Sequence, residues 1–126
     1  IAVEQDRSAT KRAALFGFRS GLLAYNNGAG WVNSTTAYTV GEWYQLTGVL
    51  NYDTRKWDFY VNGSPFASDL GFYHAAHTAA TSIRFYKGTN NLGMAVDDIT
   101  IVPEPSSILA LICGLTGIAG LLRRRP

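Results

Sequence analysis

Apolar and polar residues alternate along most of the chain up to residue 102, which is the pattern of half-buried strands. Valine, threonine and aromatic residues fill these segments, and Gly, Asn or Asp separates them about every ten residues. No segment in this part shows convincing helical periodicity. The pattern predicts an all-β fold, an antiparallel β-sandwich, with strands near 13–19, 22–25, 30–34, 43–50, 57–62, 82–86 and 93–102.

The clearest local unit is an antiparallel hairpin over residues 42–63 with a polar loop at 51–56. Successive side chains of a strand point to opposite faces, so every second residue shares a face. The resulting core candidates are Tyr44, Leu46 and Leu50 from the first strand and Trp57, Phe59 and Val61 from the second.

The pattern changes after residue 102. Two prolines make 103–105 a stiff spacer, and an uncharged run of about 17 residues follows at 106–122, which as a helix spans roughly 25 Å. We expect a transmembrane helix rather than a buried core helix, because the run lacks a polar face and precedes an arginine cluster. Basic residues stay on the cytoplasmic side, which places the bulk of the chain outside.

Pro103-Glu104-Pro105, the apolar run and the terminal arginines, in this order, resemble the PEP-CTERM sorting tail of exported bacterial proteins, also called an ice-binding protein C-terminal domain. The resemblance covers about a fifth of the chain. It implies processing near the motif by a membrane-embedded exosortase, followed by release to the cell surface or extracellular matrix. The implied sorting motif is Pro103, Glu104 and Pro105, and the membrane stop is Arg123, Arg124 and Arg125 within the tail 123–126.

The chain opens without an initiator methionine or a signal peptide, although export is expected. We therefore expect the C-terminal fragment of a longer protein, with an irregular start at 1–12 and a folded body at 13–102. Residues 1–102 carry eight basic and eight acidic residues, so this part of the chain lacks the basic surface of a nucleic-acid binder. The sole cysteine, Cys113, lies in the apolar run, which excludes an intrachain disulfide.

The tryptophan-led segment Trp57-Asp58-Phe59-Tyr60-Val61-Asn62-Gly63 and the acidic-pair segment Val96-Asp97-Asp98-Ile99-Thr100-Ile101 resemble the laminin-G or concanavalin-A-like lectin fold. The resemblance extends over residues 40–102 and more loosely over 10–102. It implies a jelly-roll sandwich, N-terminally truncated, in which strands lie upstream of this fragment.

Candidate chemistry is sparse. A glycoside hydrolase of this fold needs two carboxylates about 5 to 10 Å apart, and the glutamates Glu4, Glu42 and Glu104 are scattered. Asp97 and Asp98 are adjacent on a predicted strand and so face opposite ways. They cap a strand end or supply one ligand to a structural calcium ion. No catalytic residue and no other cofactor are predicted.

His74 and His77 are three residues apart, a spacing that suits a zinc site on a helix. No third ligand is apparent in the sequence. We therefore predict an ordinary surface loop and no metal site.

Binding remains as the expected activity. Trp31 and Tyr52 stand beside polar turns and are the candidate rings for stacking on a glycan, against the alternative that they pack in the core or over an edge. The predicted function is a surface- or matrix-sorted, non-enzymatic lectin-like module that binds exopolysaccharide or another glycan. The alternatives are an accessory domain of a polysaccharide-active enzyme whose catalytic part lies upstream, and a matrix component without a discrete ligand.

Overall fold

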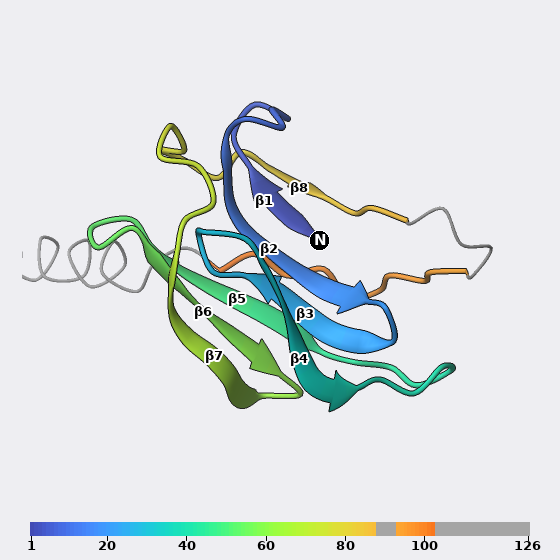
Figure 1. Cartoon of the computed structure of the whole chain (residues 1–126). Coiled ribbons are helices and arrows are strands. Elements are labelled where there is room, and N and C mark those ends of the chain that lie inside the picture. The colour runs from blue at the N-terminus through green and yellow to red at the C-terminus, as the bar shows by residue number, and fades with distance from the viewer. Residues whose placement is uncertain (88–92, 103–126) are drawn as a thin grey trace, which may run out of the picture. The chain divides into compact units, whose positions relative to one another are not determined.

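The computed structural model describes residues 1–87 and 93–102, and this part of the chain forms eight strands (Figure 1). Ile1–Asn90 and Asn91–Pro126 are separate compact units, and each is considered by itself. The strands, all in the first unit, are β1 (Ala2–Glu4), β2 (Arg12–Arg19), β3 (Leu22–Asn26), β4 (Trp31–Ala37), β5 (Leu46–Asn51), β6 (Lys56–Val61), β7 (Ser64–Gly71) and β8 (Ser82–Arg84).

The strands form two antiparallel sheets. One has five strands in the order β4-β3-β2-β1-β8, and the other has three in the order β5-β6-β7. The predicted all-β antiparallel class is confirmed for the described residues. The predicted hairpin is confirmed as β5-β6, in which Leu46 pairs with Val61 and Leu50 pairs with Trp57.

Two tight turns set the register of their hairpins. Ser20 and Gly21 join β2 to β3, and Asn62 and Gly63 join β6 to β7, all four with positive φ between 51° and 80°. Two consecutive residues with positive φ match the right-handed twist of the flanking strands, which is why Asn-Gly is favoured there. The β6-β7 turn carries this Asn-Gly pair.

The core forms where the two sheets face each other. Phe16 of β2 lies with its ring centroid 5.6 Å from that of Trp57 and 5.0 Å from that of Phe59, both on β6. Trp57 and Phe59 are 1% and 0% exposed, as predicted. Gly48 of β5 makes room for Phe16, because a Cβ there would lie 3.1 Å from the Phe16 ring. The absence of a side chain at Gly48 thus lets the sheets approach.

Two strands were not predicted. The start of the chain, expected to be irregular, forms β1, which lies between β2 and β8. Three residues are too few to show an alternating pattern. β7 carries Pro65 and Asp69, which are depleted in strands. Pro65 is tolerated because β7 is an edge strand, where an N–H on one side is not needed for pairing.

The prediction of a strand at 93–102 is wrong, since these residues form no strand. Asp98 has a φ of 51°, which breaks an extended backbone, and its backbone N–H donates a hydrogen bond to the Asp97 side chain. The described residues contain no helix of the length and apolarity needed to span a membrane. The predicted helix at 106–122 lies outside the described residues.

Candidate functional site

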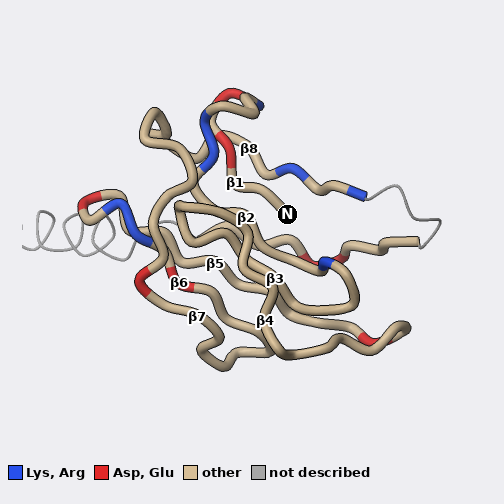
Figure 2. Tube along the Cα trace, viewed as in Figure 1, with Lys and Arg blue, Asp and Glu red and all other residues tan. Residues whose placement is uncertain are grey.

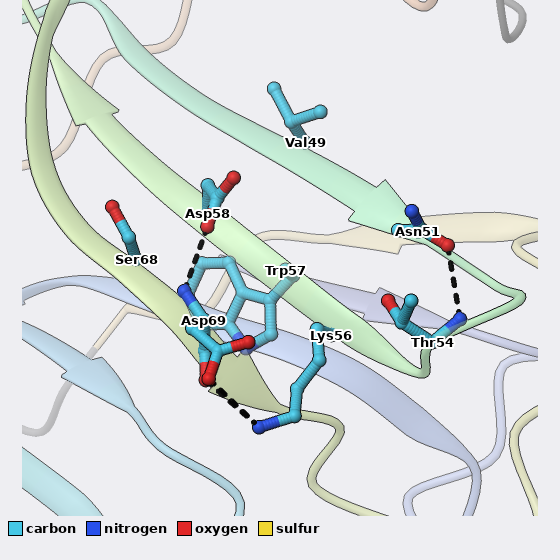
Figure 3. Close-up of a pocket in the computed structure, with 8 residues that line it drawn as sticks. All are labelled: Val49, Asn51, Thr54, Lys56, Trp57, Asp58, Ser68 and Asp69. Carbon is cyan, nitrogen blue, oxygen red and sulfur yellow. Dashed lines mark hydrogen bonds and ion pairs between the residues drawn. The ribbon is translucent and has the colours of Figure 1, made fainter.

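An open depression of about 370 Å³ lies on the outer face of the sheet β5-β6-β7 (Figure 3). Because Trp57 and Phe59 point into the core, the residues that alternate with them on β6 point outward. The lining residues are Val49, Asn51, Thr54, Lys56, Trp57, Asp58, Ser68 and Asp69. All but Val49 and Trp57 are polar, and they come from all three strands and one turn.

A β-bulge shapes the depression. Trp57 pairs with Leu70 and Phe59 with Ala67, so two residues of β7 stand opposite the single Asp58 of β6. One of the two, Asp69, adopts a φ of 57°. The bulge therefore re-aims the β7 side chains at the point where Asp58 faces them.

Side chains hold the bulge from both sides. Asp58 Oδ1 accepts a hydrogen bond of 2.8 Å from the Asp69 backbone N–H. Lys56 Nζ donates to the Asp69 carbonyl and lies 3.2 Å from its carboxylate. Among the described residues the second Asp58 oxygen has no hydrogen-bond partner, and the Asp69 carboxylate forms an exposed ion pair with Lys56.

The turn between β5 and β6 forms the other wall. Asn51 Oδ1 accepts hydrogen bonds of 3.0 Å from the backbone N–H groups of Asp53 and Thr54, an arrangement that fixes the turn. Among the described residues, neither the Asn51 amide nitrogen nor the Ser68 hydroxyl has a hydrogen-bond partner. The depression therefore offers an amide donor, a hydroxyl and a carboxylate oxygen around the apolar side chain of Val49.

Sequence reasoning missed this site. It predicted no carboxylate pair, whereas the structure brings Asp58 and Asp69 to one depression. The two are separated by the Asn62-Gly63 turn, and this Asn-Gly pair is the signal that could have placed the segment after it on a strand paired with β6. The unpredicted strand β7 is the reason for the miss.

The two predicted ligand rings do not meet at this depression. Trp31 opens β4 in the other sheet, is 42% exposed, and has the Arg19 guanidinium 5.5 Å above its ring. Tyr52 lies in the β5-β6 turn with its ring packed edge-on against Phe72. Neither residue lines the depression. Their role in ligand binding stays a prediction.

The prediction that His74 and His77 belong to an ordinary surface loop is wrong for His77, because its side chain is fully buried. A carbonyl only accepts, so His77 Nδ1 donates to the Lys11 carbonyl at 3.2 Å, and the neutral ring then accepts the Tyr52 hydroxyl at Nε2 (2.9 Å). Burial lowers the pKa of His77, and the charge of Arg55 adds to the effect, while the Lys11 bond opposes it. His74 is also engaged, through its Nδ1 and the Arg12 backbone N–H.

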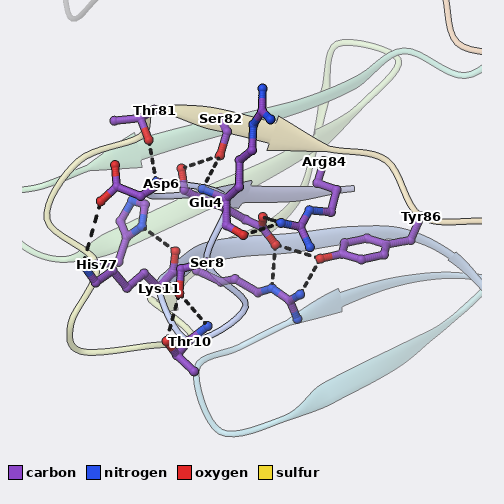
Figure 4. Close-up of polar contacts among 12 residues, drawn as sticks. Glu4, Asp6, Ser8, Thr10, Lys11, His77, Thr81, Ser82, Arg84 and Tyr86 are labelled. Atoms are coloured by element: carbon purple, nitrogen blue, oxygen red, sulfur yellow. Dashed lines mark hydrogen bonds and ion pairs between the residues drawn. The ribbon is translucent and has the colours of Figure 1, made fainter.

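A buried carboxylate lies at the start of the chain (Figure 4). Glu4 Oε1 accepts from Tyr86 at 2.7 Å and from Arg12 at 2.8 Å, and Arg84 lies 2.9 Å from Oε2 in an ion pair without hydrogen-bond geometry. Burial opposes ionisation of Glu4, but the two hydrogen bonds and the two positive charges together lower its pKa. Burial and the bond to Glu4 raise the pKa of Tyr86. The cluster joins β1, β2, β8 and the segment after β8.

Among the described residues, no group of three or more His, Cys, Asp or Glu side chains could hold a metal ion. The predicted sorting motif at 103–105 and the arginines at 123–125 lie outside the described residues. No protein-family model, curated protein or solved structure matches the chain. Function is therefore inferred from the geometry of the site and from the sequence.

Proposed function

We propose that the protein is a non-enzymatic, exported glycan-binding module that holds a saccharide against the outer face of β5-β6-β7. The observation that carries the proposal is the depression itself, in which Asn51, Ser68 and Asp58 present hydrogen-bonding atoms around Val49 on a paired sheet. Sugar hydroxyls both donate and accept, so a mixed set of donors and acceptors around a small apolar surface suits them.

Binding is favoured over hydrolysis because both carboxylates have partners within the sheet. Asp58 accepts from a backbone N–H, and Asp69 is paired with Lys56. A glycosidase needs two carboxylates that flank the scissile bond, whereas these two are engaged in holding the bulge of the sheet. The all-β antiparallel architecture agrees with a lectin-like sandwich, and we propose the concanavalin-A-like jelly roll as its finer class.

For the tail we propose sorting. The stiff segment 103–105 is the recognition site of an exosortase-type membrane enzyme, the run 106–122 crosses the bilayer before processing, and Arg123, Arg124 and Arg125 stop transfer. The module then reaches the cell surface or the extracellular matrix. Deletion of 103–126 should leave the body soluble but misdirected in cell fractionation, and the same fraction for both forms would contradict sorting.

The binding proposal is tested with the full chain on an array of neutral and acidic bacterial oligosaccharides. Asp58→Asn and Ser68→Ala should each weaken binding to any retained glycan about tenfold, because each removes or weakens a hydrogen bond to a hydroxyl. Asp53→Asn is the matched control. Asp53 lies in the β5-β6 turn beside Thr54, which lines the depression, but Asp53 itself does not line it. Equal losses in Asp53→Asn and Asp58→Asn would refute the site.

Trp31→Ala and Tyr52→Ala belong in the same experiment. A loss in either variant, with Asp58→Asn unchanged, would move the ligand to the predicted aromatic residues. Unchanged binding in both variants would remove Trp31 and Tyr52 as candidates.

A further inference from the structure

The loop between β4 and β5, residues 38–45, displays two apolar side chains to solvent. Val40 is 74% exposed and Trp43 is 69% exposed. Glu42 is the only charged residue of the loop, and Figure 2 shows the loop as tan with one short acidic segment. The loop does not line the glycan depression. Its exposed surface therefore calls for a separate explanation.

Hydrogen bonds within the loop fix its backbone. The Tyr44 hydroxyl accepts a hydrogen bond of 2.9 Å from the Thr39 backbone N–H, and the Glu42 N–H donates to the Thr39 carbonyl at 3.3 Å. Gly41 has a φ of 88° at the turn, a conformation that glycine adopts without strain. These contacts hold Val40 and Trp43 outward.

Aromatic packing fixes the base of the loop. The ring centroids of Tyr38 and Tyr44 lie 4.8 Å and 5.5 Å from that of Phe18 on β2. Tyr38 and Tyr44, near the two ends of the loop, thus pack against the five-stranded sheet. A rigid base lowers the entropy lost when the tip contacts a partner.

We propose that Val40 and Trp43 insert into the interfacial region of a phospholipid bilayer. Tryptophan favours the boundary between headgroups and acyl chains, and an adjacent aliphatic side chain adds apolar area. Val40 and Trp43 lie three residues apart and are both largely exposed, so the loop presents apolar area beyond the indole, with Glu42 as its one charge. Since the loop has no Lys or Arg, insertion should not depend on anionic lipid.

This inference rests on the proposed membrane tail, which before processing supplies the proximity that a small apolar tip needs. About 20 residues separate the end of β8 at Arg84 from the start of the apolar run at Ser106, and a chain of that length reaches at most roughly 70 Å. Tethering over such a distance raises the effective concentration of the loop at the bilayer, so a contact that is weak in isolation becomes populated.

The test uses fluorescence of the full chain on vesicles of palmitoyl-oleoyl phosphatidylcholine, with and without brominated acyl chains. Trp31→Phe leaves Trp43 and the buried Trp57 as emitters, and Trp43→Phe is its matched counterpart. Brominated lipid should quench the Trp31→Phe chain at least twofold and leave the Trp43→Phe chain nearly unquenched. Adding Val40→Ser to Trp31→Phe should reduce the quenching.

Equal quenching of the Trp31→Phe and Trp43→Phe chains, or none in either, would overturn the insertion. A blue shift of Trp43 emission with soluble bacterial polysaccharide but not with vesicles would assign the loop to a glycan and likewise overturn it. Flotation with the vesicles reports the tail separately. A full chain that floats without quenching refutes the loop alone, and equal flotation of the full chain and of a chain lacking 103–126 refutes the tail alone.

Discussion

His77 links protonation to folding at the scale of one residue. Its ring is buried and neutral in the fold, with both nitrogens engaged by Lys11 and Tyr52. Its pKa in the folded protein lies below the ordinary value of 6.5, so the unfolded chain takes up a proton first as the pH falls. The stability from neutral His77 is therefore complete above pH 6.5 and is lost as the pH falls toward the folded pKa.

We predict that the free energy of unfolding, measured by urea titration, falls between pH 7.5 and pH 5.5. His77→Asn should flatten this fall, because the titrating group is removed, while lowering stability at pH 7.5 by about 1 to 3 kcal/mol through the bonds left unmade. A fall of the same size in the variant and the natural chain would show that another group is responsible.

Glu4 is buried in the charged form, whereas His77 is buried in the neutral form. The Glu4→Gln change keeps its shape but leaves Arg12 and Arg84 without their shared counter-charge. We expect a loss of about 2 to 4 kcal/mol at pH 7, below the full cost of breaking a buried pair because Arg84 is partly exposed. The loss should shrink below pH 4.5, where the stability from ionised Glu4 itself disappears. A loss that stays constant down to pH 3 would contradict this assignment.

At the scale of the elements, the approach of β2 to β5 depends on Gly48. Alanine there would place its Cβ 3.1 Å and 3.4 Å from two carbons of the Phe16 ring, which Trp57 and Phe59 hold in place. We expect Gly48→Ala to lower the free energy of unfolding by about 1 to 3 kcal/mol through overpacking. Gly30→Ala is the control, because nothing lies within 4 Å of its added Cβ. Equal stability of the two variants would mean that the core adapts.

The elements also show what a sequence pattern can predict. Hairpin β5-β6 was predictable because Leu46, Leu50, Trp57 and Phe59 repeat with period two across a polar turn. Strand β7 was not predictable, since Pro65 and Asp69 are residue types that are depleted in strands. The depression was missed with it, because two of its lining residues lie on β7. His77 was also missed, because burial of a polar residue depends on Tyr52 and Lys11, which are distant along the chain.

At the scale of the whole molecule, the three residues of β1 join parts of the chain that are distant in sequence. Ala2 pairs with Leu15 of β2 and with Arg84 of β8, so β1 is the only described link between those strands in the sheet. It also supplies Val3 to the core and Glu4 to the arginine cluster. Long-range pairing of this kind depends on every strand between the two edges being present.

We therefore expect removal of residues 1–4 to release β8 and to destabilise the five-stranded sheet, despite the loss of only one short strand. Hydrogen exchange should show amides of residues 82–84 exchanging far faster, while exchange in β5-β6 should speed up less because that hairpin pairs within its own sheet. Val3→Ala is the milder control, since it keeps the backbone pairs and removes only apolar contact. Protection of residues 82–84 unchanged by the deletion would show that β8 docks without β1, and the order of the five-stranded sheet would then need revision.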